Sequence, residues 1–341
     1  MITDLLQRVL STSPLRRVDA RHVFDTLGAP ATQDAERAAL LMALNVRPRT
    51  VEDLTSLAFE MRRRAEPFSP RGREQAIDLC GSGGAPLRSF NVSTVSAFVV
   101  AAAGQPVIKH GNRSARGTCG SSDLLNALGL PIFASRAYPK ETFRRWRLAF
   151  LHAPLYHSVA GAVAGIRKQL GIPTIFNELG PLANPAGVPF QVTGVADASR
   201  QRLVAGALQR LGVRRGMVVT SDEGADEFSP KQTSRVLEWG SGRFITHRVK
   251  ASSLLPPPDR RGSWSSLDPH DAARQTERLF EGERGARRGA ALLTSAAALW
   301  VGGRSKSLGA GIQIATDALD SGVVASLLGD MQDLARTQSW D

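Results

Sequence analysis

One stretch, residues 78–123, constrains the fold of this chain more than any other. A short apolar segment, residues 76–80, leads directly into the run Gly81-Ser82-Gly83-Gly84. After one apolar helix, a second apolar segment, residues 106–109, leads into the cluster Lys109-His110-Gly111-Asn112-Arg113-Ser114. Two strand-to-loop transitions separated by a helix predict a parallel βαβ unit. The loops at the carboxyl ends of parallel strands open on the same edge of the sheet.

The residue types in these two loops favour an anion. Glycines let backbone N–H groups approach a ligand closely, and a helix N-terminus adds donors and a favourable dipole. Lys109 and Arg113 add full positive charges. Either loop alone is typical of an ordinary turn or of the surface. Both together at one sheet edge predict a pocket for a heavily phosphorylated small molecule.

The charge balance agrees with this prediction without specifying the ligand. The chain has 341 residues and a net charge of +12, from 43 Lys and Arg against 31 Asp and Glu. Such a charge attracts phosphates on a nucleotide, a sugar or a nucleic acid. The basic residues are dispersed, and no long polybasic tail is present. Most of them are therefore expected to be solvated surface charge.

Cysteine content and hydropathy narrow the class of protein. Cys80 and Cys119 are the only two cysteines, which excludes a disulfide framework and a cysteine-rich metal site. This count suits a reducing compartment, and we expect a cytoplasmic protein. The sequence shows neither a signal-peptide pattern nor an uninterrupted apolar run of membrane-spanning length. No membrane association is expected.

The chain divides into two parts by pattern. Residues 1–66 show only helical spacing, with a capping-box sequence at Thr50-Val51-Glu52-Asp53 before a helix that runs to about Glu66. We expect a small helical domain whose exposed apolar face carries a homodimer surface. Residues 67–73 are a linker, and residues 74–341 form the second part.

Strands alternate with helices in the second part. Strands are expected at 76–80, 106–109, 148–153, 191–196 and 216–221, with helices at 93–103, 121–128, 140–147 and 199–211. This alternation predicts a large α/β domain with a mainly parallel central sheet flanked by helices. Residues 232–249 predict a hairpin, residues 256–266 a loop, and the chain from residue 271 is helical, with a buried helix at 290–300.

Two further clusters carry chemistry. Arg167 offers a planar fork suited to a carboxylate, although its segment alone favours a surface ion pair with Glu178 or another acid. The run 222–227 places four acids directly after a strand. Such a loop is either solvated or holds Mg²⁺ together with substrate phosphates. The sequence lacks zinc-ligand spacing, a nucleophile elbow and a Walker A lysine loop, which disfavours zinc, covalent and nucleoside-triphosphate chemistry.

Taken in order, the motifs resemble a known family. GSGG…SFNVST, KHGNRS…GSSDLL, AP-x-x-H, R-K-x-L-G-x-x-T-x-F-N-x-L-G-P-L-x-N-P and an Asp-Glu pair follow one another as in anthranilate phosphoribosyltransferases. The resemblance covers nearly the whole chain. It implies the nucleoside phosphorylase/phosphoribosyltransferase type of fold, in which about residues 158–188 join the helical domain. The pyrimidine nucleoside phosphorylases share only the first blocks.

The resemblance implies an activity and a set of site residues. The family transfers 5-phosphoribosyl from phosphoribosyl pyrophosphate to anthranilate with Mg²⁺, releasing pyrophosphate, in tryptophan biosynthesis. The implied phosphoribosyl pyrophosphate ligands are Gly81, Ser82, Gly83, Gly84, Asn91, Ser93, Thr94, Lys109, Cys119, Gly120 and Ser121. The implied acceptor ligands are His110, Asn112, His157 and Arg167, and the implied metal ligands are Ser93, Asp226 and Glu227. No protein nucleophile is implied, because positioning and electrostatics suffice.

Some positions depart from the family pattern. Ala85 stands where the glycine loop usually has Asp, and Ser158 and Ala160 stand where the family often has Pro and a larger residue. Two alternatives therefore remain open. One is the same chemistry on another aromatic acceptor, and the other is an inactive relative that binds nucleic acid through its basic surface.

Overall fold

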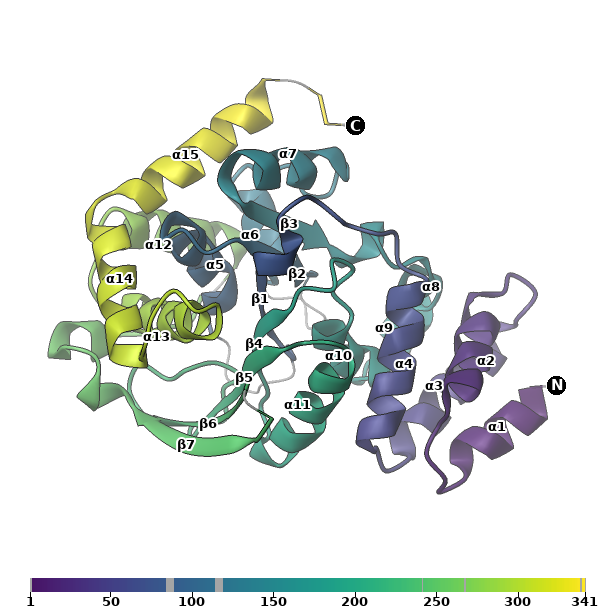
Figure 1. The fold of residues 1–341 in the computed structure, drawn as a ribbon. Helices are drawn as coiled ribbons and strands as arrows, with labels where there is room; N and C mark the ends of the chain where they lie inside the picture. The colour runs from purple at the N-terminus through teal and green to yellow at the C-terminus, as the bar shows by residue number, and fades with distance from the viewer. Residues whose placement is uncertain are drawn as a thin grey trace.

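Four helices at the N-terminus lie at one end of the molecule, beyond the sheet (Figure 1). In the computed structural model, which describes residues 2–83, 89–113, 119–240, 242–266, 268–337 and 339–340, they are α1 (Ile2–Leu10), α2 (Arg17–Gly28), α3 (Asp34–Val46) and α4 (Val51–Arg63). The predicted capping box is confirmed, because Thr50 Oγ1 accepts a 3.1 Å hydrogen bond from the Asp53 amide. The helix it begins ends at Arg63, earlier than predicted.

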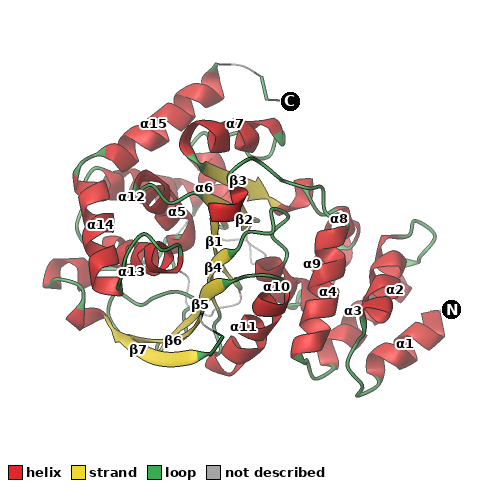
Figure 2. Cartoon of the chain, in the orientation of Figure 1, coloured by secondary structure: helices red, strands yellow, loops and turns green. Residues whose placement is uncertain are grey.

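A single seven-stranded sheet forms the centre of the molecule (Figure 2). In spatial order its strands are β3 (Leu148–His152), β2 (Val107–Gly111), β1 (Ile77–Gly81), β4 (Phe190–Gly194), β5 (Arg215–Ser221), β6 (Thr233–Trp239) and β7 (Ile245–Lys250). The first five are parallel, and β6 and β7 are antiparallel, which confirms the predicted hairpin. The central strands are buried on both faces, as parallel strands usually are.

Helices cover both faces of the sheet. On one side lie α5 (Val92–Ala102), α6 (Ser121–Ala127), α12 (Pro269–Phe280), α13 (Ala286–Val301), α14 (Leu308–Asp320) and α15 (Val323–Arg336). The helix α7 (Ala137–Trp146) packs at the β3 edge of the sheet. On the other lie α10 (Ile175–Leu179) and α11 (Gln201–Arg210), with α4 beyond them. Residues 290–299 of α13 are all buried, as the apolar pattern predicted. Two large cores result, one on each face.

The segment that follows β3 packs with the N-terminal helices. It contains α8 (Ser158–Ala162), α9 (Ala164–Leu170) and α10, and its buried side chains share one core with those of α2, α3 and α4. Phe176 of α10, for example, contacts Phe24 of α2 with ring centroids 6.1 Å apart. On these contacts we propose that the helical domain comprises residues 1–66 together with about 158–188. Residues 74–341 otherwise form the α/β domain.

One predicted loop has more structure than its composition indicated. Within residues 256–266, Pro257–Arg260 form a 3-10 turn whose Asp259 is buried and paired with Arg284 at 2.8 Å. The composition missed this anchor because the partner lies on a distant segment. Among the described residues, no helix is long and apolar enough to cross a membrane.

Candidate functional site

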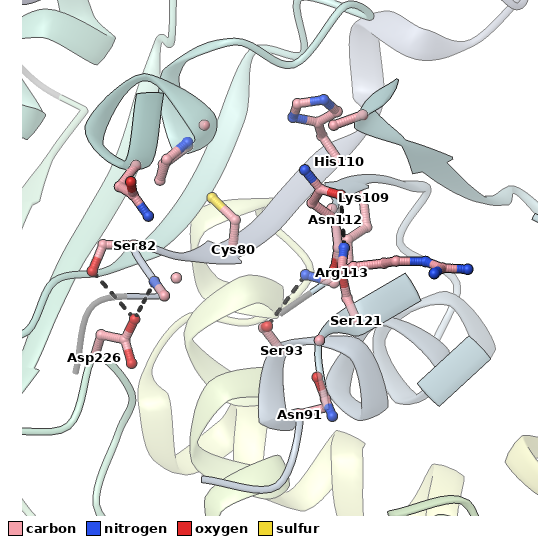
Figure 3. A pocket seen from close by; sticks show the side chains of 18 of the residues that line it. Cys80, Ser82, Asn91, Ser93, Lys109, His110, Asn112, Arg113, Ser121 and Asp226 are labelled. Atoms are coloured by element: carbon pink, nitrogen blue, oxygen red, sulfur yellow. Dashed lines mark hydrogen bonds between the residues drawn. The ribbon is translucent and has the colours of Figure 1, made fainter. Parts of the chain in front are cut away.

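A cavity of about 300 Å³ lies at the carboxyl ends of β1 and β2. Its walls come from both strand-end loops, from the N-terminus of α5, from the loop after β5 and from α8–α10 (Figure 3). The fold therefore brings the two predicted loops to one edge of the sheet. The acidic run, more than a hundred residues later in the sequence, joins them there.

Asp226 anchors the described part of the glycine loop. Its Oδ2 accepts a 2.8 Å hydrogen bond from the Gly83 amide and a 3.3 Å bond from Ser82 Oγ. Two glycines leave room for Asp226, Gly81 for its side chain and Gly194 for its backbone. A Cβ at Gly81 would lie 2.8 Å from Asp226 Oδ2, and one at Gly194 would lie 1.6 Å from the Asp226 carbonyl oxygen. This side of the cavity is thus built around one carboxylate.

Lys109, Ser93 and Glu227 form a second charged group. Lys109 Nζ donates to Ser93 Oγ at 3.2 Å and to the Leu79 carbonyl at 2.5 Å. Ser93 in turn bonds Glu227. All three line the cavity, and both charged residues are buried. Burial, and then the neighbouring Asp226, raise the pKa of Glu227 to about 8, although Lys109 opposes the shift.

Residues 119–121 are hydrogen-bonded to the start of α5 and to the loop after β2. Asn91 precedes the helix, and its Nδ2 donates to the Cys119 carbonyl at 3.3 Å and to Cys119 Sγ at 3.1 Å. Ser121 Oγ donates to the Asn112 carbonyl at 3.1 Å. These bonds hold residues 119–121 beside the start of α5. Both cysteines are free thiols, and burial raises the pKa of Cys119 to about 11, so no thiolate is expected there.

Arg167 faces the cavity from α9, on the side of the helical domain. Its Nε donates to Thr174 Oγ1 at 3.0 Å and its Nη2 donates to Asn177 Oδ1 at 3.2 Å, while its guanidinium lies over the Phe176 ring at 5.4 Å. The predicted ion pair with Glu178 is wrong. Glu178 pairs with Arg49 and Arg200 instead, so Arg167 has neutral partners only among the described residues.

Two buried histidines pack against each other at the cavity, with His110 in its lining and His157 behind His110. The rings of His110 and His157 meet edge to face with centroids 5.1 Å apart. Burial lowers the pKa of both, for His157 to about 4, and the neighbouring His157 further disfavours a proton on His110. Both imidazoles are therefore neutral at pH 7. Among the described residues neither Nε2 has a hydrogen-bond partner.

Most residues implied by the resemblance lie around one cavity. The lining includes Gly81, Ser82, Gly83, Asn91, Ser93, Lys109, His110, Asn112, Cys119, Gly120, Ser121, Arg167, Asp226 and Glu227. Thr94 and His157 do not line it. Thr94, in the first turn of α5, has no exposed area, and His157 lies behind His110. Gly84 and Ala85 lie outside the described residues.

The structure adds lining residues to which sequence reasoning gave no individual ligand role, although Gly111 and Arg113 belong to the predicted loop after the second strand. They are Met61, Cys80, Ser89, Gly111, Arg113, Ala153, Ala160, Phe176, Asn177, Gly180 and Pro181. Phe176, Asn177, Gly180 and Pro181 belong to the quoted N-x-L-G-P-L block and its flank, so the motif itself was the available signal. Met61, from the helical domain, had no such signal.

The carboxylate pair fits a divalent cation. Asp226 and Glu227 are adjacent, buried and line the same cavity, and burial together with the neighbouring Asp226 raises the pKa of Glu227, a penalty that a bound cation would relieve. No cluster of three or more His, Cys, Asp or Glu that would hold a metal alone occurs in the described ranges. This donor set suits Mg²⁺, which commonly takes one or two carboxylates and completes its shell with water and substrate phosphates.

Known proteins resemble this chain over its full length. The glycosyl transferase family, a/b domain, matches residues 73–325, and the glycosyl transferase family, helical bundle domain, matches residues 3–65. Anthranilate phosphoribosyltransferase of Pelotomaculum thermopropionicum is 36% identical over 337 residues, covering 97% of this chain and 96% of that protein.

Solved structures agree with the sequence relatives. Anthranilate phosphoribosyltransferase of Thermus thermophilus superposes with a TM-score of 0.88 at 33% identity, covering 98% of this chain and all of that one. The Saccharomyces cerevisiae enzyme, solved in complex with PRPP and Mg, shares the fold with a TM-score of 0.86 at 23% identity, covering 99% and 98%. Both the fold and the family match confirm the predicted architecture and enzyme class. This chain is a pentosyltransferase and belongs to the anthranilate phosphoribosyltransferase family.

Proposed function

We propose that this protein transfers the 5-phosphoribosyl group of phosphoribosyl pyrophosphate to anthranilate, with Mg²⁺ and release of pyrophosphate, in tryptophan biosynthesis. One observation carries the proposal. A single cavity combines a glycine loop, a buried lysine and a carboxylate pair on one side with an arginine that lacks an acidic partner among the described residues on the other. The first set suits a diphosphate and its metal, and the second suits an aromatic acid.

The donor half binds charge. In this proposal the Gly81–Gly83 turn and the start of α5 supply backbone and hydroxyl donors to the phosphate groups. Lys109 supplies a full positive charge, which stabilises the departing pyrophosphate more than the intact substrate. Gly84 and Thr94 stay predictions from the sequence. Cys119, Gly120 and Ser121 close the same half across Asn91.

Asp226 and Glu227 would hold Mg²⁺, with Ser93 beside them. The ion supplies Lewis-acid stabilisation of the leaving diphosphate when it is bound. The protein's own contribution is to keep both carboxylates in place. Ser82 and Gly83 hold Asp226, and Ser93 holds Glu227, through the hydrogen bonds described above.

The acceptor half orients an aromatic amine. Arg167 would bind the carboxylate of anthranilate, and Asn112 and His110 lie along the same wall. The amine is already nucleophilic, so orientation near the ribose carbon accounts for much of the rate. His157 contributes through its contact with His110.

A product assay tests the proposal directly. Purified protein is mixed with phosphoribosyl pyrophosphate, Mg²⁺ and a panel of aromatic amines, and both pyrophosphate and the ribosylated product are measured. We expect product with anthranilate only when Mg²⁺ is present. Product with another amine and not with anthranilate would support the alternative in which the same chemistry acts on another aromatic acceptor. No turnover together with tight, salt-sensitive binding of single-stranded nucleic acid would instead support the binding-protein alternative.

We also propose a cytoplasmic homodimer formed through the N-terminal helices. Leu10, Val18 and Val46 are large apolar side chains on or beside these helices that are 45–66% exposed. Sedimentation at micromolar concentration should give twice the chain mass, and Val46→Asp should shift the protein toward monomer. The matched control is Glu52→Gln, a polar change on the same bundle. A monomeric wild type would refute the dimer.

A further inference from the structure

The two strands that lead into the site separate from each other. Backbone pairing between β1 and β2 occurs only at Ile77 and Val107, near their start. The outer partners are regular, because β1 pairs with β4 and β2 pairs with β3 over five positions each. The backbone ladder between β1 and β2 is therefore interrupted over the part of both strands that leads to the site.

Side chains occupy the hydrogen-bonding positions that the ladder leaves. The Ile77 amide donates to the Pro106 carbonyl at 2.9 Å, and a continued parallel ladder would next join Leu79 with Ile108 and His110. Instead, the Ile108 carbonyl accepts from Asn184 Nδ2 at 2.9 Å and the His110 amide donates to Asp78 Oδ1 at 3.2 Å.

Lys109 provides a hydrogen-bond donor for β1, the strand opposite its own. Its Nζ donates to the Leu79 carbonyl at 2.5 Å. Asp78, Asn184 and Lys109 together form what we call the polar wedge, and all three are at least 97% buried. Backbone groups buried here without partners would each be costly. The separation of the strands is thus stabilised by a specific set of hydrogen bonds.

The wedge is locked on the side of the helical domain. Asn184 Nδ2 also donates to Asp78 Oδ2 at 2.8 Å, and Asn184 Oδ1 accepts from the Ala186 amide at 2.9 Å. Asn184 comes from the loop after α10, so this loop is joined to both strands. Neither Asp78 nor Asn184 lines the cavity.

We propose that Asp78 and Asn184 are positioning residues that set the separation between the two halves of the site. The inference rests on the proposed function. The Gly81–Gly83 turn continues β1 and belongs to the donor half, whereas His110 and Asn112 continue β2 and border the acceptor. Weakening the wedge changes the distance between these turns while leaving the ligands of each half present.

Loss of alignment has a kinetic signature that differs from loss of binding. A displacement of about 1 Å between reacting groups costs on the order of a hundredfold in rate. Asn184→Ala should therefore lower kcat by roughly that factor. The Kd for phosphoribosyl pyrophosphate with Mg²⁺ should change by less than about threefold, since Asn184 does not touch the cavity. Asp78→Asn keeps an acceptor for the His110 amide and should lose less, about tenfold in kcat.

Gln105→Ala provides the matched control. Gln105 is equally buried and joins the same two strands at their far end, where its Nε2 donates to the Gln75 carbonyl at 2.6 Å. Its loss should lower the free energy of unfolding like the wedge variants while kcat stays within about threefold of wild type.

Calorimetry, steady-state kinetics and unfolding are measured on all four proteins. A drop in kcat for Asn184→Ala and Asp78→Asn, absent in Gln105→Ala at equal loss of stability, supports the inference. Equal kcat in Asn184→Ala and Gln105→Ala would overturn this inference and leave the proposed function untouched. Failure of the wild type to bind phosphoribosyl pyrophosphate would overturn the proposed function, and the inference with it.

Discussion

The donor and acceptor halves of the cavity are built in different ways. The donor half uses strand ends and one long helix of the α/β domain, and its charged groups Lys109, Asp226 and Glu227 are at least 92% buried. The acceptor half uses the short helices α8, α9 and α10, and Arg167 is only partly buried there. A buried charge is stable only when its partners are correctly placed, so a substitution near it is costly. A half-exposed charge is also solvated by water, so substitutions near it cost less.

This difference suggests where specificity can vary. The donor half is connected to the central sheet by hydrogen bonds to backbone groups, such as that from Lys109 to Leu79. The acceptor half is bounded by small side chains such as Ala160, on helices of five to seven residues. We expect substitutions in the donor half to lower every activity and those in the acceptor half to change the preferred amine.

Among the variants that compare the donor and acceptor halves, we expect Lys109→Ala to have the largest effect on substrate binding. It removes a buried positive charge that we propose contacts the diphosphate, which should cost about 1.5–3 kcal/mol of phosphoribosyl pyrophosphate binding. Calorimetry with Mg²⁺ measures this, and Lys140→Ala, an exposed lysine on α7, is the control. Unchanged affinity would place the diphosphate elsewhere.

Arg167→Ala should have a smaller and more selective effect. Because Arg167 is partly exposed, loss of its carboxylate contact should raise the anthranilate KM about tenfold, near the lower end for a charge-assisted bond. The KM for phosphoribosyl pyrophosphate should not move. Lys168→Ala, the exposed neighbour on α9, is the control. Equal changes in both KM values would show that the two halves are not independent.

The raised pKa of Glu227 in the donor half should make the stability of the protein depend on pH. Glu227 has a folded pKa of about 8, above its ordinary 4.5, so the folded protein holds the proton longer than the unfolded chain. Without Mg²⁺, stability should therefore fall as pH rises toward 8, with a slope of at most about 1.4 kcal/mol per pH unit.

Chemical unfolding between pH 6.5 and 8 measures this slope. The lower end of this window reaches the ordinary histidine pKa of about 6.5, where the buried histidines stay neutral in the folded protein but still charge in the unfolded chain, which makes stability rise with pH. The contribution of Glu227 is therefore the difference in slope between the wild type and Glu227→Gln. Glu227→Gln should flatten the slope, and Mg²⁺ should stabilise the wild type more at pH 8 than at pH 6.5. A wild-type slope that Glu227→Gln leaves unchanged would contradict the assignment.

The smallest effect is expected from Ala85→Asp, which restores the carboxylate usual in the family. The position follows the glycine loop, outside the described residues. We expect a shift in the Mg²⁺ concentration that gives half-maximal turnover, because an added carboxylate binds the metal directly or through water. A two-way titration of Mg²⁺ against anthranilate tests it. A changed acceptor KM with an unchanged Mg²⁺ profile would mean that the glycine loop belongs to the acceptor half.

The sequence alone predicted the sheet and most of the cavity lining for a physical reason. Glycines and charged residues that directly follow apolar segments mark strand ends, and strand ends of a parallel sheet converge. Gly81 and Lys109 could be placed in this way. The position of Asp226 directly after a strand left a solvated loop and a metal loop both open, and the resemblance decided between them. Arg167 was assigned by the resemblance alone.

Other features depend on contacts that no local pattern reveals. Asp78 looks like an ordinary residue of a strand, and its role depends on Asn184, which is 106 positions away. The expected partner of Arg167 was wrong because Glu178 had two other arginines available, from α4's flank and from the turn before α11. Thr94 lies in the first turn of a helix that borders the cavity, yet it is fully buried and does not line the cavity.

Gly194 has a consequence for the lineage of this protein. Its φ is not among the positive values that favour glycine, so it is needed for space, since a Cβ would overlap the Asp226 carbonyl. A descendant that acquires any side chain here must first have moved the acidic loop away from β4. A relative with any other residue at this position is therefore expected to have a displaced acidic loop. Such relatives can be identified from their sequences before any of them is assayed.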